Sequence, residues 1–594
     1  MQLIKSNLSS ILKTFDCKVQ KGVFPYNFMN SENLFYIGNK PEKKYYESLS
    51  LKKYNEIPNN NWNVKDETLK YLKSDIEGLL EILLKFSKNI FENYSLNISN
   101  YPTLPSLTLS IYTSSFYNES NKIKMIKGQV EKDIRKSYFG GNVDVYINEV
   151  KNAYIYDMNS QYPNAMLQEM PIGNPIFTTE KNIDNIFGFV YGKITAPSEE
   201  ILRVPFIQYK DSYIGNVTCP RGEFSRMIFT EEMKYARKYG YSIDIEYAYH
   251  FEKGTGLFDD FVNKHYLIKK ESTDPVLRQI AKLMLNALYG KFGMKELNSK
   301  LKIISVKEAN KIIKNYNYSV FAKLNNDKVL VKYSSRINEN LRKLFKTQED
   351  RFSEKAESVK SIFLSDTGLG KKRGVPSAVH IASAIAAYSR ISINEFKNIP
   401  GNPCIMSDTD SVVLPKKLNE QFIGKEIGQM KLEYIIKHGI FIRKKLYAII
   451  TDQNKEVIKA SGAKSKFLNF DNFITLLNGN NVVSERLSFN VIWKELKINI
   501  VKTPITLKGL NHQPLTLFNT TDTNFKFISI PKSYPLILYS KNILNLSRRT
   551  LSLNRLSGAQ TSEAYLSDLS TQIMENKPQQ ELDRLDDTKR FKEP

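Results

Sequence analysis

Apolar side chains recur at helical spacing in three stretches of the chain. The pattern predicts helices over 70–91, over 258–292 and, with small alanines that permit close packing, over 375–396. The first of these is amphipathic, and its apolar positions are Leu72, Ile76, Leu79, Leu80, Leu83 and Leu84. Pro102 and Pro105 interrupt the pattern that follows and indicate a boundary there.

Apolar runs of strand length surround three acidic residues, Asp157, Asp408 and Asp410. The first ends one strand pattern, and the other two lie within the run 405–414. In an extended segment side chains two apart point the same way, so Asp408 and Asp410 are expected to face one side. Two converging carboxylates repel each other unless a cation compensates, which favours a divalent metal. A polar turn in a hairpin is the alternative interpretation.

Asp157 lies where its predicted strand enters a turn, a position from which a side chain reaches into a site. With Asp408 and Asp410 it supplies three carboxylates from two strands, enough to hold two Mg²⁺ ions that also bind substrate phosphates. Two such ions activate the attacking oxygen and stabilise the leaving oxygen in phosphoryl transfer. Taken by itself, Asp157 is equally well explained as a surface acid at a strand end.

A cationic stripe is predicted on the second helical stretch. Arg278, Lys282, Asn286 and Tyr289 are four, four and three residues apart and fall along one side of a helix. Two cations one turn apart suit a polyphosphate, and a tyrosine ring suits a base. The alternative is an ordinary solvated face.

Two shorter motifs carry less information. Lys445 and Tyr447 alternate on a predicted strand over 441–450, so they are expected to share a face suited to a backbone phosphate. Tyr138-Phe-Gly140-Gly141, taken alone, predicts a turn.

Charge and cysteine content narrow the class of protein. The 594 residues exceed one typical core, so several domains are expected, and the net charge of +24 favours a polyanionic partner such as nucleic acid. No apolar run approaches the roughly 18–20 residues of a membrane span. The three cysteines and five histidines show no metal-ligand spacing, so any metal should be bound by oxygen.

In order along the chain, these segments resemble the protein-primed family B DNA polymerases. That group includes enzymes of linear mitochondrial plasmids and of some bacteriophages and adenoviruses. The motifs D-x-x-S-L-Y-P, K-x-x-x-N-S-x-Y-G, Y-x-D-T-D-S, K-x-Y and Y-x-G-G are matched by residues 157–163, 282–290, 406–411, 445–447 and 138–141. Three positions differ from the family pattern: Gln161, Ala287 and Met406.

The resemblance implies a role for each matched residue. The implied catalytic metal ligands, for two Mg²⁺ or Mn²⁺ ions, are Asp157, Asp408 and Asp410. The residues implied to bind the incoming dNTP are Tyr162, Lys269, Arg278, Lys282, Asn286 and Tyr289. Those implied to bind DNA are Tyr138, Gly140, Gly141, Thr409, Ser411, Lys445 and Tyr447.

The implied fold is α+β and multidomain, a right-hand polymerase of palm, fingers and thumb with a partial RNase H-like exonuclease domain. The expected boundaries are 1–95 for a truncated exonuclease-like domain, 96–168 for the first palm part, 169–256 for terminal-protein region 1, 257–293 for the fingers, 294–370 for terminal-protein region 2 and a connection, 371–477 for the second palm part, 478–560 for the thumb and 561–594 for a disordered tail.

Proofreading is not expected. Tyr71 and Asp75 match the third exonuclease motif, Y-x-x-x-D, but the two acidic motifs that should precede it find no room. A 3′–5′ exonuclease needs those carboxylates for its own metal pair. Asp75 is then expected to be an acid on the surface of a helix.

The expected function is therefore replication of a linear element by two-metal nucleotidyl transfer. The partners would be template and primer DNA, dNTPs and a terminal protein whose Ser, Thr or Tyr hydroxyl is the first primer. A monomer located in the mitochondrion, without membrane association, is expected. Two alternatives are a catalytically inactive, DNA-binding remnant and a non-enzymatic scaffold for single strands.

Overall fold

The computed structural model describes residues 3–4, 7–29, 33, 35–46, 49–117, 123–210, 217–294, 299–309, 316–323, 327–337, 378–463, 465–492, 497–510, 515–517 and 528–530. Contacts divide the chain into a unit of 1–207 with 222–534 and a unit of 208–221 with 535–594. The described part of the second unit holds the paired strands β7 (Tyr209–Lys210) and β8 (Val217–Thr218). No helix in the described residues combines the length and apolar character needed to span a bilayer. The helices and sheets that carry the predicted site residues belong to the first unit. The expected tail 561–594 lies outside the described residues.

The N-terminal part is built around one long helix, α3 (Val64–Tyr94), which confirms the helix expected over 70–91. Asn63 caps its first turn, and Ser95 ends it in a left-handed conformation. The apolar side chains that predicted this helix do not form its core face, because most of them are exposed. The buried face, against which α1 (Leu8–Thr14) packs, instead carries Val64, Gly78, Ile82, Phe86 and Ile90.

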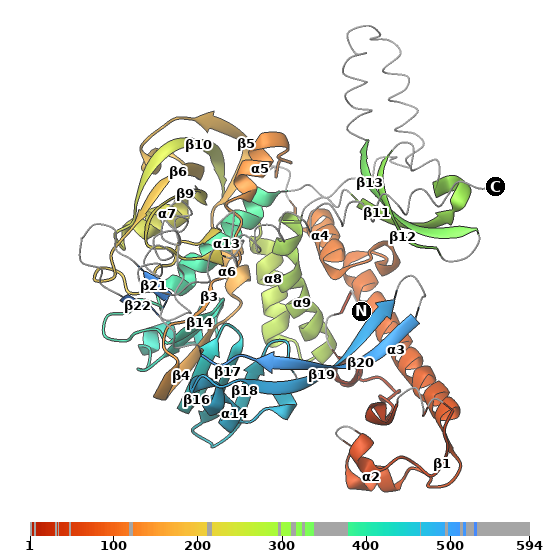
Figure 1. Ribbon diagram of the computed structural model, residues 1–594. Helices are drawn as coiled ribbons and strands as arrows, with labels where there is room; N and C mark the ends of the chain where they lie inside the picture. The colour runs from red at the N-terminus through yellow and green to blue at the C-terminus, as the bar shows by residue number, and fades with distance from the viewer. Residues whose placement is uncertain are drawn as a thin grey trace, which may run out of the picture. The chain divides into compact units, whose positions relative to one another are not determined.

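The stretch expected as one helix over 258–292 is two helices, α8 (Asp259–Glu271) and α9 (Pro275–Phe292), seen together in Figure 1. Pro275 lacks the N–H that a continuous helix needs, and Asp274 caps the new helix by accepting from the Val276 N–H at 2.7 Å. The third expected helix is α13 (Val379–Asn394), which is buried on nearly all sides. The other helices are α2 (Leu51–Asn55), α4 (Leu104–Ser115), α5 (Gly128–Arg135), α6 (Gln161–Met166), α7 (Thr230–Arg237) and α14 (Phe470–Leu477).

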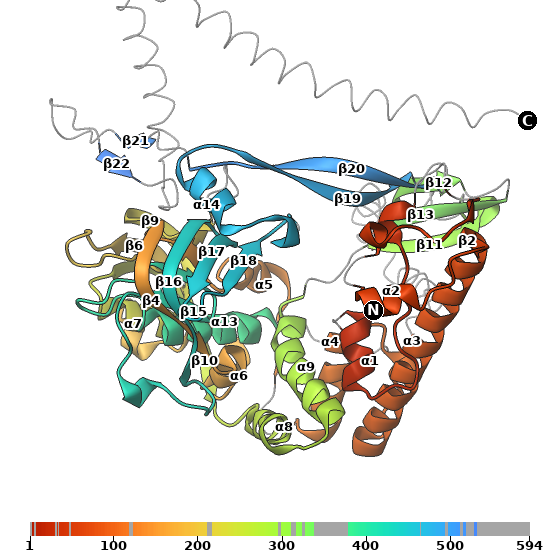
Figure 2. The ribbon, with the colours of Figure 1, turned by 90° about the horizontal axis from the view of Figure 1, so that it is seen from below.

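A seven-stranded antiparallel sheet holds all three acidic residues of interest. Its order is β18-β17-β16-β4-β15-β14-β3, so β4 lies between β16 and β15, which both come from much later in the chain (Figure 2). The bounds are β3 (Val143–Val145), β4 (Glu149–Met158), β14 (Met406–Asp408), β15 (Ser411–Leu414), β16 (Met430–Arg443), β17 (Leu446–Thr451) and β18 (Glu456–Ala460). Side chains alternate along β4, with Ile155 in one buried cluster and Tyr156 in the cluster on the opposite face.

The region 169–256 forms a second sheet of four antiparallel strands, in the order β5-β10-β6-β9. These strands are β5 (Met170–Thr178), β6 (Gly188–Ala196), β9 (Gly222–Phe229) and β10 (Ser242–Gly254). Helix α7 follows β9 directly and packs on this sheet. The remaining pairs and small sheets are β1 (Ile37–Gly38) with β2 (Trp62–Asn63), β11 (Ser299–Ser305) and β12 (Tyr316–Lys323) on either side of β13 (Lys328–Ile337), β19 (Val482–Ile492) with β20 (Lys497–Leu507), and β21 (Leu515–Leu517) with β22 (Ile528–Ile530).

Candidate functional site

Asp408 and Asp410 lie at the tip of a tight hairpin. Strand β14 ends at Asp408, β15 begins at Ser411, and Thr409 has a φ of 62°. The expectation that the two carboxylates alternate on one extended strand is therefore wrong, and the hairpin-turn alternative describes the backbone. The turn is held by the Thr409 N–H, which donates to the carbonyl of Asn142 at 3.0 Å.

The sheet register brings Asp157 and Asp410 together from distant parts of the sequence. Ser411 is paired with Asp157, and the Met158 N–H donates to the carbonyl of Asp410 at 2.8 Å. Burial, the Asp410 charge and Glu433 raise the pKa of Asp157 to about 7. Burial and the nearby Asp408 also raise the pKa of Asp410. Burial is the larger cause of both shifts, and repulsion from acidic neighbours adds to it, as the repulsion argument from the sequence anticipated.

Asp408 has a different partner. The Lys445 ammonium donates to both of its carboxylate oxygens, at 2.6 and 2.7 Å. Lys445 lies in the turn between β16 and β17 with a φ of 59°, so the expected alternation with Tyr447 along one strand is wrong. The Tyr447 ring nevertheless lies near the same acid, since burial and then Asp408 and Glu433 raise its pKa to about 12.

The donor set determines which metal these residues suit. In the part of the chain that the structure describes, no group of three His, Cys, Asp or Glu side chains is arranged to hold an ion. The close pair is Asp157 and Asp410, while Asp408 is engaged by Lys445. Two like-charged oxygen donors with raised pKa values fit a hard divalent cation such as Mg²⁺ or Mn²⁺.

Cations from α8 and α9 lie beside this acidic pair. The Lys269 ammonium donates to Ser160 Oγ at 2.7 Å. Burial and the neighbouring Lys282 lower the pKa of Lys269, whereas Asp157 raises it. Lys269 is thus within electrostatic range of Asp157, an expected metal ligand, and Lys282 is within range of Lys269.

The predicted stripe on α9 is confirmed as a surface. Arg278, Lys282 and Asn286 are exposed, while Ile280, Met284, Leu285 and Leu288 on the other side are buried. Tyr289 is half-buried and stacks on Tyr162, with ring centroids 4.1 Å apart and planes 6° from parallel. The stacked rings join the stripe to α6, which begins immediately after Ser160.

The loop that carries Tyr138, Gly140 and Gly141 packs directly against the hairpin. A Cβ added at Gly141 would clash with the side chain of Thr409, whereas one added at Gly140 would meet nothing within 4 Å. A Cβ at Gly293 would come within 2.5 Å of the Tyr138 ring. Of Gly140 and Gly141, only Gly141 is therefore required by packing.

Several residues that position these groups were not identified from the sequence. The Gln161 amide donates to the carbonyls of Ser389 and Thr409, at 2.9 and 3.1 Å, so this departure from the family pattern supports the hairpin. Glu433 acts on both Asp157 and Asp410 from β16. Gln161 could have been found from the sequence, because it departs from the family motif. The neighbours of Glu433 depend on strand register, which the sequence does not reveal.

The pair expected as an exonuclease remnant lies on α3. The Tyr26 hydroxyl donates to that of Tyr71 at 2.5 Å, and Asp75 acts on Tyr71. Asp75 is half-buried with one enclosed carboxylate oxygen, so the expectation of a plain surface acid is wrong.

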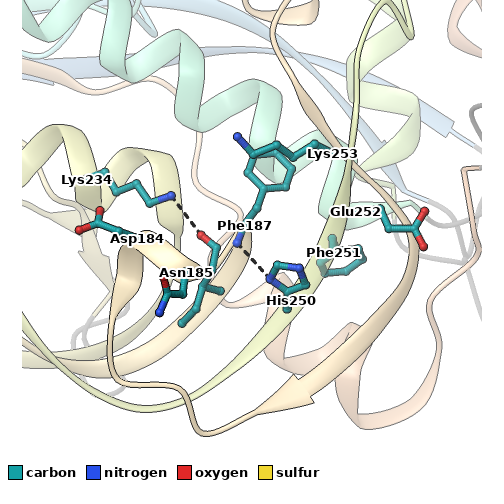
Figure 3. A pocket seen from close by; sticks show the side chains of 9 residues that line it. Asp184, Asn185, Phe187, Lys234, His250, Phe251, Glu252 and Lys253 are labelled. Carbon is teal, nitrogen blue, oxygen red and sulfur yellow. Dashed lines mark hydrogen bonds between the residues drawn. The ribbon is translucent and has the colours of Figure 1, made fainter.

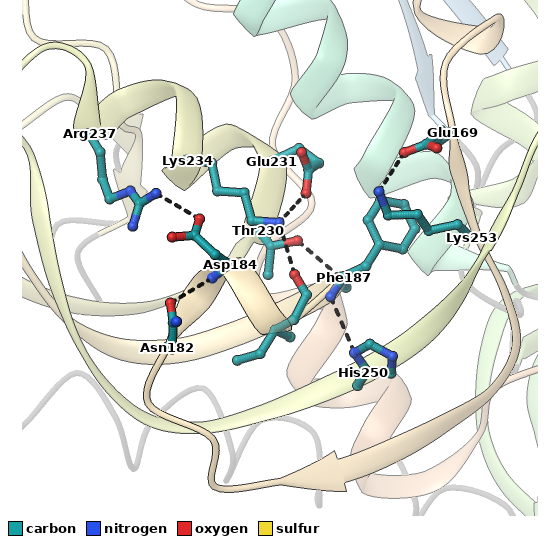
Figure 4. Close-up of polar contacts among 12 residues, drawn as sticks. Glu169, Asn182, Asp184, Phe187, Thr230, Glu231, Lys234, Arg237, His250 and Lys253 are labelled. Atoms are coloured by element: carbon teal, nitrogen blue, oxygen red, sulfur yellow. Dashed lines mark hydrogen bonds and ion pairs between the residues drawn. The ribbon is translucent and has the colours of Figure 1, made fainter.

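A separate cleft of about 300 Å³ opens on the four-stranded sheet (Figure 3). Its two lysines are paired, as Figure 4 shows: Lys234 pairs with Glu231 at 2.8 Å and Lys253 with Glu169 at 2.9 Å. His250 Nδ1 accepts from the Phe187 N–H at 3.3 Å. This cleft holds none of the residues predicted to bind nucleotide or metal.

The seven-stranded sheet thus carries an acidic hairpin, and Lys269 of α8 lies near its Asp157. The chain belongs to the family of type B DNA polymerases, organellar and viral, whose model matches residues 1–397. It is 41% identical over 525 residues to a protein of Agaricus bitorquis named "Probable DNA polymerase", covering 86% of this chain and 65% of that one. The corresponding protein of Podospora anserina is 31% identical over 528 residues, covering 85% and 43%.

Bacillus phage phi29 provides a relative in both sequence and fold. Its DNA polymerase is 29% identical over 246 residues, covering 39% of this chain and 42% of that one. The structure of that polymerase with primer-template DNA and incoming nucleotide superposes with a TM-score of 0.56 at 18% identity, covering 85% and 79%. The expected polymerase fold is thereby confirmed. This chain covers 65% of the length of the Agaricus protein and 43% of the Podospora protein.

Proposed function

We propose that the chain is a DNA-directed DNA polymerase. The observation that carries the proposal is the convergence of Asp157 and Asp410 on paired strands beside Lys269, whose neighbour on α9 is Lys282. In the reaction a primer 3′-hydroxyl attacks the α-phosphate of a dNTP and pyrophosphate leaves. Two divalent ions, when bound, would supply charge neutralisation for the attacking and leaving oxygens.

The remaining residues fit roles around that reaction. Lys269, Lys282 and Arg278 would bind the triphosphate, since they present cations from adjoining helices. The stacked rings of Tyr162 and Tyr289 would hold the sugar and base of the nucleotide. Asn286 lies one turn from Tyr289 on the same surface.

DNA would be bound on the hairpin side. Lys445 and Tyr447 lie near Asp408, and Gly141, in the same loop as Tyr138 and Gly140, lies against Thr409. Ser411, paired with Asp157, lies beside the same turn. These positions suit a primer terminus and the template strand that pairs with it.

Primer extension tests the proposal. Purified full-length chain with a primed template, dNTPs and Mg²⁺ is expected to extend the primer, and Asp410→Ala is expected to lower the rate by at least about 10³-fold. Asp452→Ala, an exposed acid in a turn, is the matched control and should behave as the parent does. Metal-independent extension, or none by the parent chain, would reject the assignment.

We further propose that synthesis starts on a terminal-protein hydroxyl of Ser, Thr or Tyr, on a linear element in mitochondria. The organellar and viral family and the phage relative support this. The regions 169–256 and 294–370 are the candidates for terminal-protein contact. Transfer of a labelled dNMP to a protein, followed by alkaline hydrolysis to separate Ser or Thr from Tyr linkage, tests the priming. Organelle fractionation tests the location.

We also propose that this chain performs no 3′–5′ proofreading. Among the described residues, Asp75 is the one carboxylate that acts on the ring pair of Tyr26 and Tyr71. A mispaired primer end should therefore persist. Its removal by the parent chain, lost in Asp75→Ala, would contradict this. An inactive DNA-binding remnant, the competing function, predicts DNA binding without extension in the same assay.

A further inference from the structure

A fully buried ion pair connects the four-stranded sheet region with the catalytic part of the molecule. Arg390 on α13 donates through Nε and Nη2 to the two carboxylate oxygens of Glu232 on α7, at 2.6 and 2.7 Å. Each side chain is 1% exposed. The two parallel bonds fix the plane and direction of the guanidinium as well as its position.

The remaining guanidinium nitrogen has a different target. Nη1 of Arg390 donates to the carbonyl of Phe139 at 2.7 Å and to that of Gly140 at 3.3 Å. These carbonyls belong to the loop that begins at Tyr138. Glu232 therefore orients the Arg390 guanidinium, whose Nη1 holds this loop.

The loop in turn bounds the turn that carries Asp410. Gly141 leaves no space for a Cβ against Thr409, and the Asn142 carbonyl accepts from the Thr409 N–H at 3.0 Å. The residue before Arg390 contributes as well, because the Ser389 carbonyl accepts from the Gln161 amide that also binds the Thr409 carbonyl. A chain of direct contacts thus leads from Glu232 to the acidic turn.

Energetics argue that this pair serves orientation. A buried ion pair is costly to desolvate, and apolar side chains of equal volume often stabilise a fold as well or better. Removing one member leaves an uncompensated buried charge. The directional contacts to two loop carbonyls are what apolar replacements could not supply.

We propose that Glu232 and Arg390 are positioning residues for the polymerase reaction, holding the 138–142 loop against the Thr409–Asp410 turn. This inference rests on the proposed function. It gives the region 169–256 a part in assembling the catalytic site, because α7 supplies the carboxylate. Lys269 and Lys282 belong to other helices, so triphosphate binding should be independent of the pair.

Kinetics on the full-length chain separate positioning from nucleotide binding. Glu232→Gln is expected to lower kcat about 10- to 100-fold while the KM for dNTP changes by less than about threefold. Glu231→Gln on the same helix, whose carboxylate pairs with Lys234, is the matched control and should retain parental kcat. An unchanged kcat in Glu232→Gln, or a loss confined to KM, would overturn the proposal.

The exchanged pair, E232R with R390E, distinguishes orientation from mere stability. It restores a buried ion pair but directs a carboxylate toward the carbonyls of Phe139 and Gly140. Recovery of Tm with kcat still low supports positioning, whereas recovery of both would make the pair only structural. If this double variant or Glu232→Gln does not fold, Arg390→Lys is measured in its place. Lysine keeps the charge but loses the two parallel hydrogen bonds, so kcat should again fall while the KM for dNTP changes little.

Hydrogen exchange gives a readout that needs no activity. In Glu232→Gln, amides of residues 138–142 and 405–411 should exchange at least about fivefold faster than in Glu231→Gln, while those of α9 are unchanged. Equal exchange would reject the positioning role. An inactive parent chain with this exchange pattern would instead reject the proposed function and leave the contact chain supported.

Discussion

Asp157 and Asp410 carry partly buried carboxyl groups whose negative charges repel each other. Their raised pKa values mean that the folded chain keeps protons that the unfolded chain has already released. Without a cation, this part of the molecule therefore destabilises the fold as pH rises. A divalent ion bound there, as proposed above, would relieve this repulsion.

Asp157 should make the free energy of unfolding depend on pH. Because the pKa of Asp157 is about 7 when folded and near 3.8 when unfolded, stability should fall as pH rises between these values and then level off. Asp157→Asn cannot ionise, so without divalent ions its Tm should exceed the parental Tm at about pH 8 and match it at about pH 4. Asp408→Asn, which removes a charge paired with Lys445, should show no such gain. Equal pH profiles for the parent and Asp157→Asn would contradict the argument.

The second prediction concerns the paired glycines. Gly141→Ala places a methyl group into Thr409, so the turn must shift, and extension activity should fall at least about tenfold. Gly140→Ala meets open space and should retain activity within about twofold. Steady-state primer extension compares the two. Similar losses in both variants would show that backbone freedom, and not packing against Thr409, is what the loop requires.

At the scale of single elements, α3 separates helix formation from burial. Its exposed leucines and its buried face lie on different sides of the same helix. Leu80→Ala, at a position 55% exposed, should change the free energy of unfolding by less than about 1 kcal/mol. Ile82→Ala, at a fully buried position, should cost about 2–5 kcal/mol. Urea denaturation measures both, and the reverse order would mean that the leucine stripe is the core face.

The sequence predicted element types better than their geometry. Periodicity located α3, α9 and α13 because helices repeat within a few residues, but the break at Pro275 needed closer attention to proline. Motif order predicted which groups are catalytic, yet it could not show that Asp410 lies in a turn or that Lys445 binds Asp408. Those facts follow from strand register and from contacts between distant segments, and local patterns do not encode them.

At the scale of the whole molecule, the charge of +24 should dominate DNA affinity. Cations that neutralise phosphates release condensed counterions, so Kd for a primed duplex should rise about 10- to 10³-fold between about 50 and 200 mM salt. Fluorescence anisotropy measures the slope. A peptide-nucleic-acid probe of the same sequence has no phosphates, and its binding should be weak and nearly independent of salt. A flat slope for DNA would contradict an electrostatic interface.

The strand order of the seven-stranded sheet has a consequence for how the protein forms. Strand β4 pairs with β15 and β16, which emerge from the ribosome only after the four-stranded sheet and helices α8 and α9 have been made. Such distant pairings are slow to form, and sequential synthesis delays them further. During translation Asp157 is therefore present long before Asp410, and the strand pairing that brings the two acids together forms late.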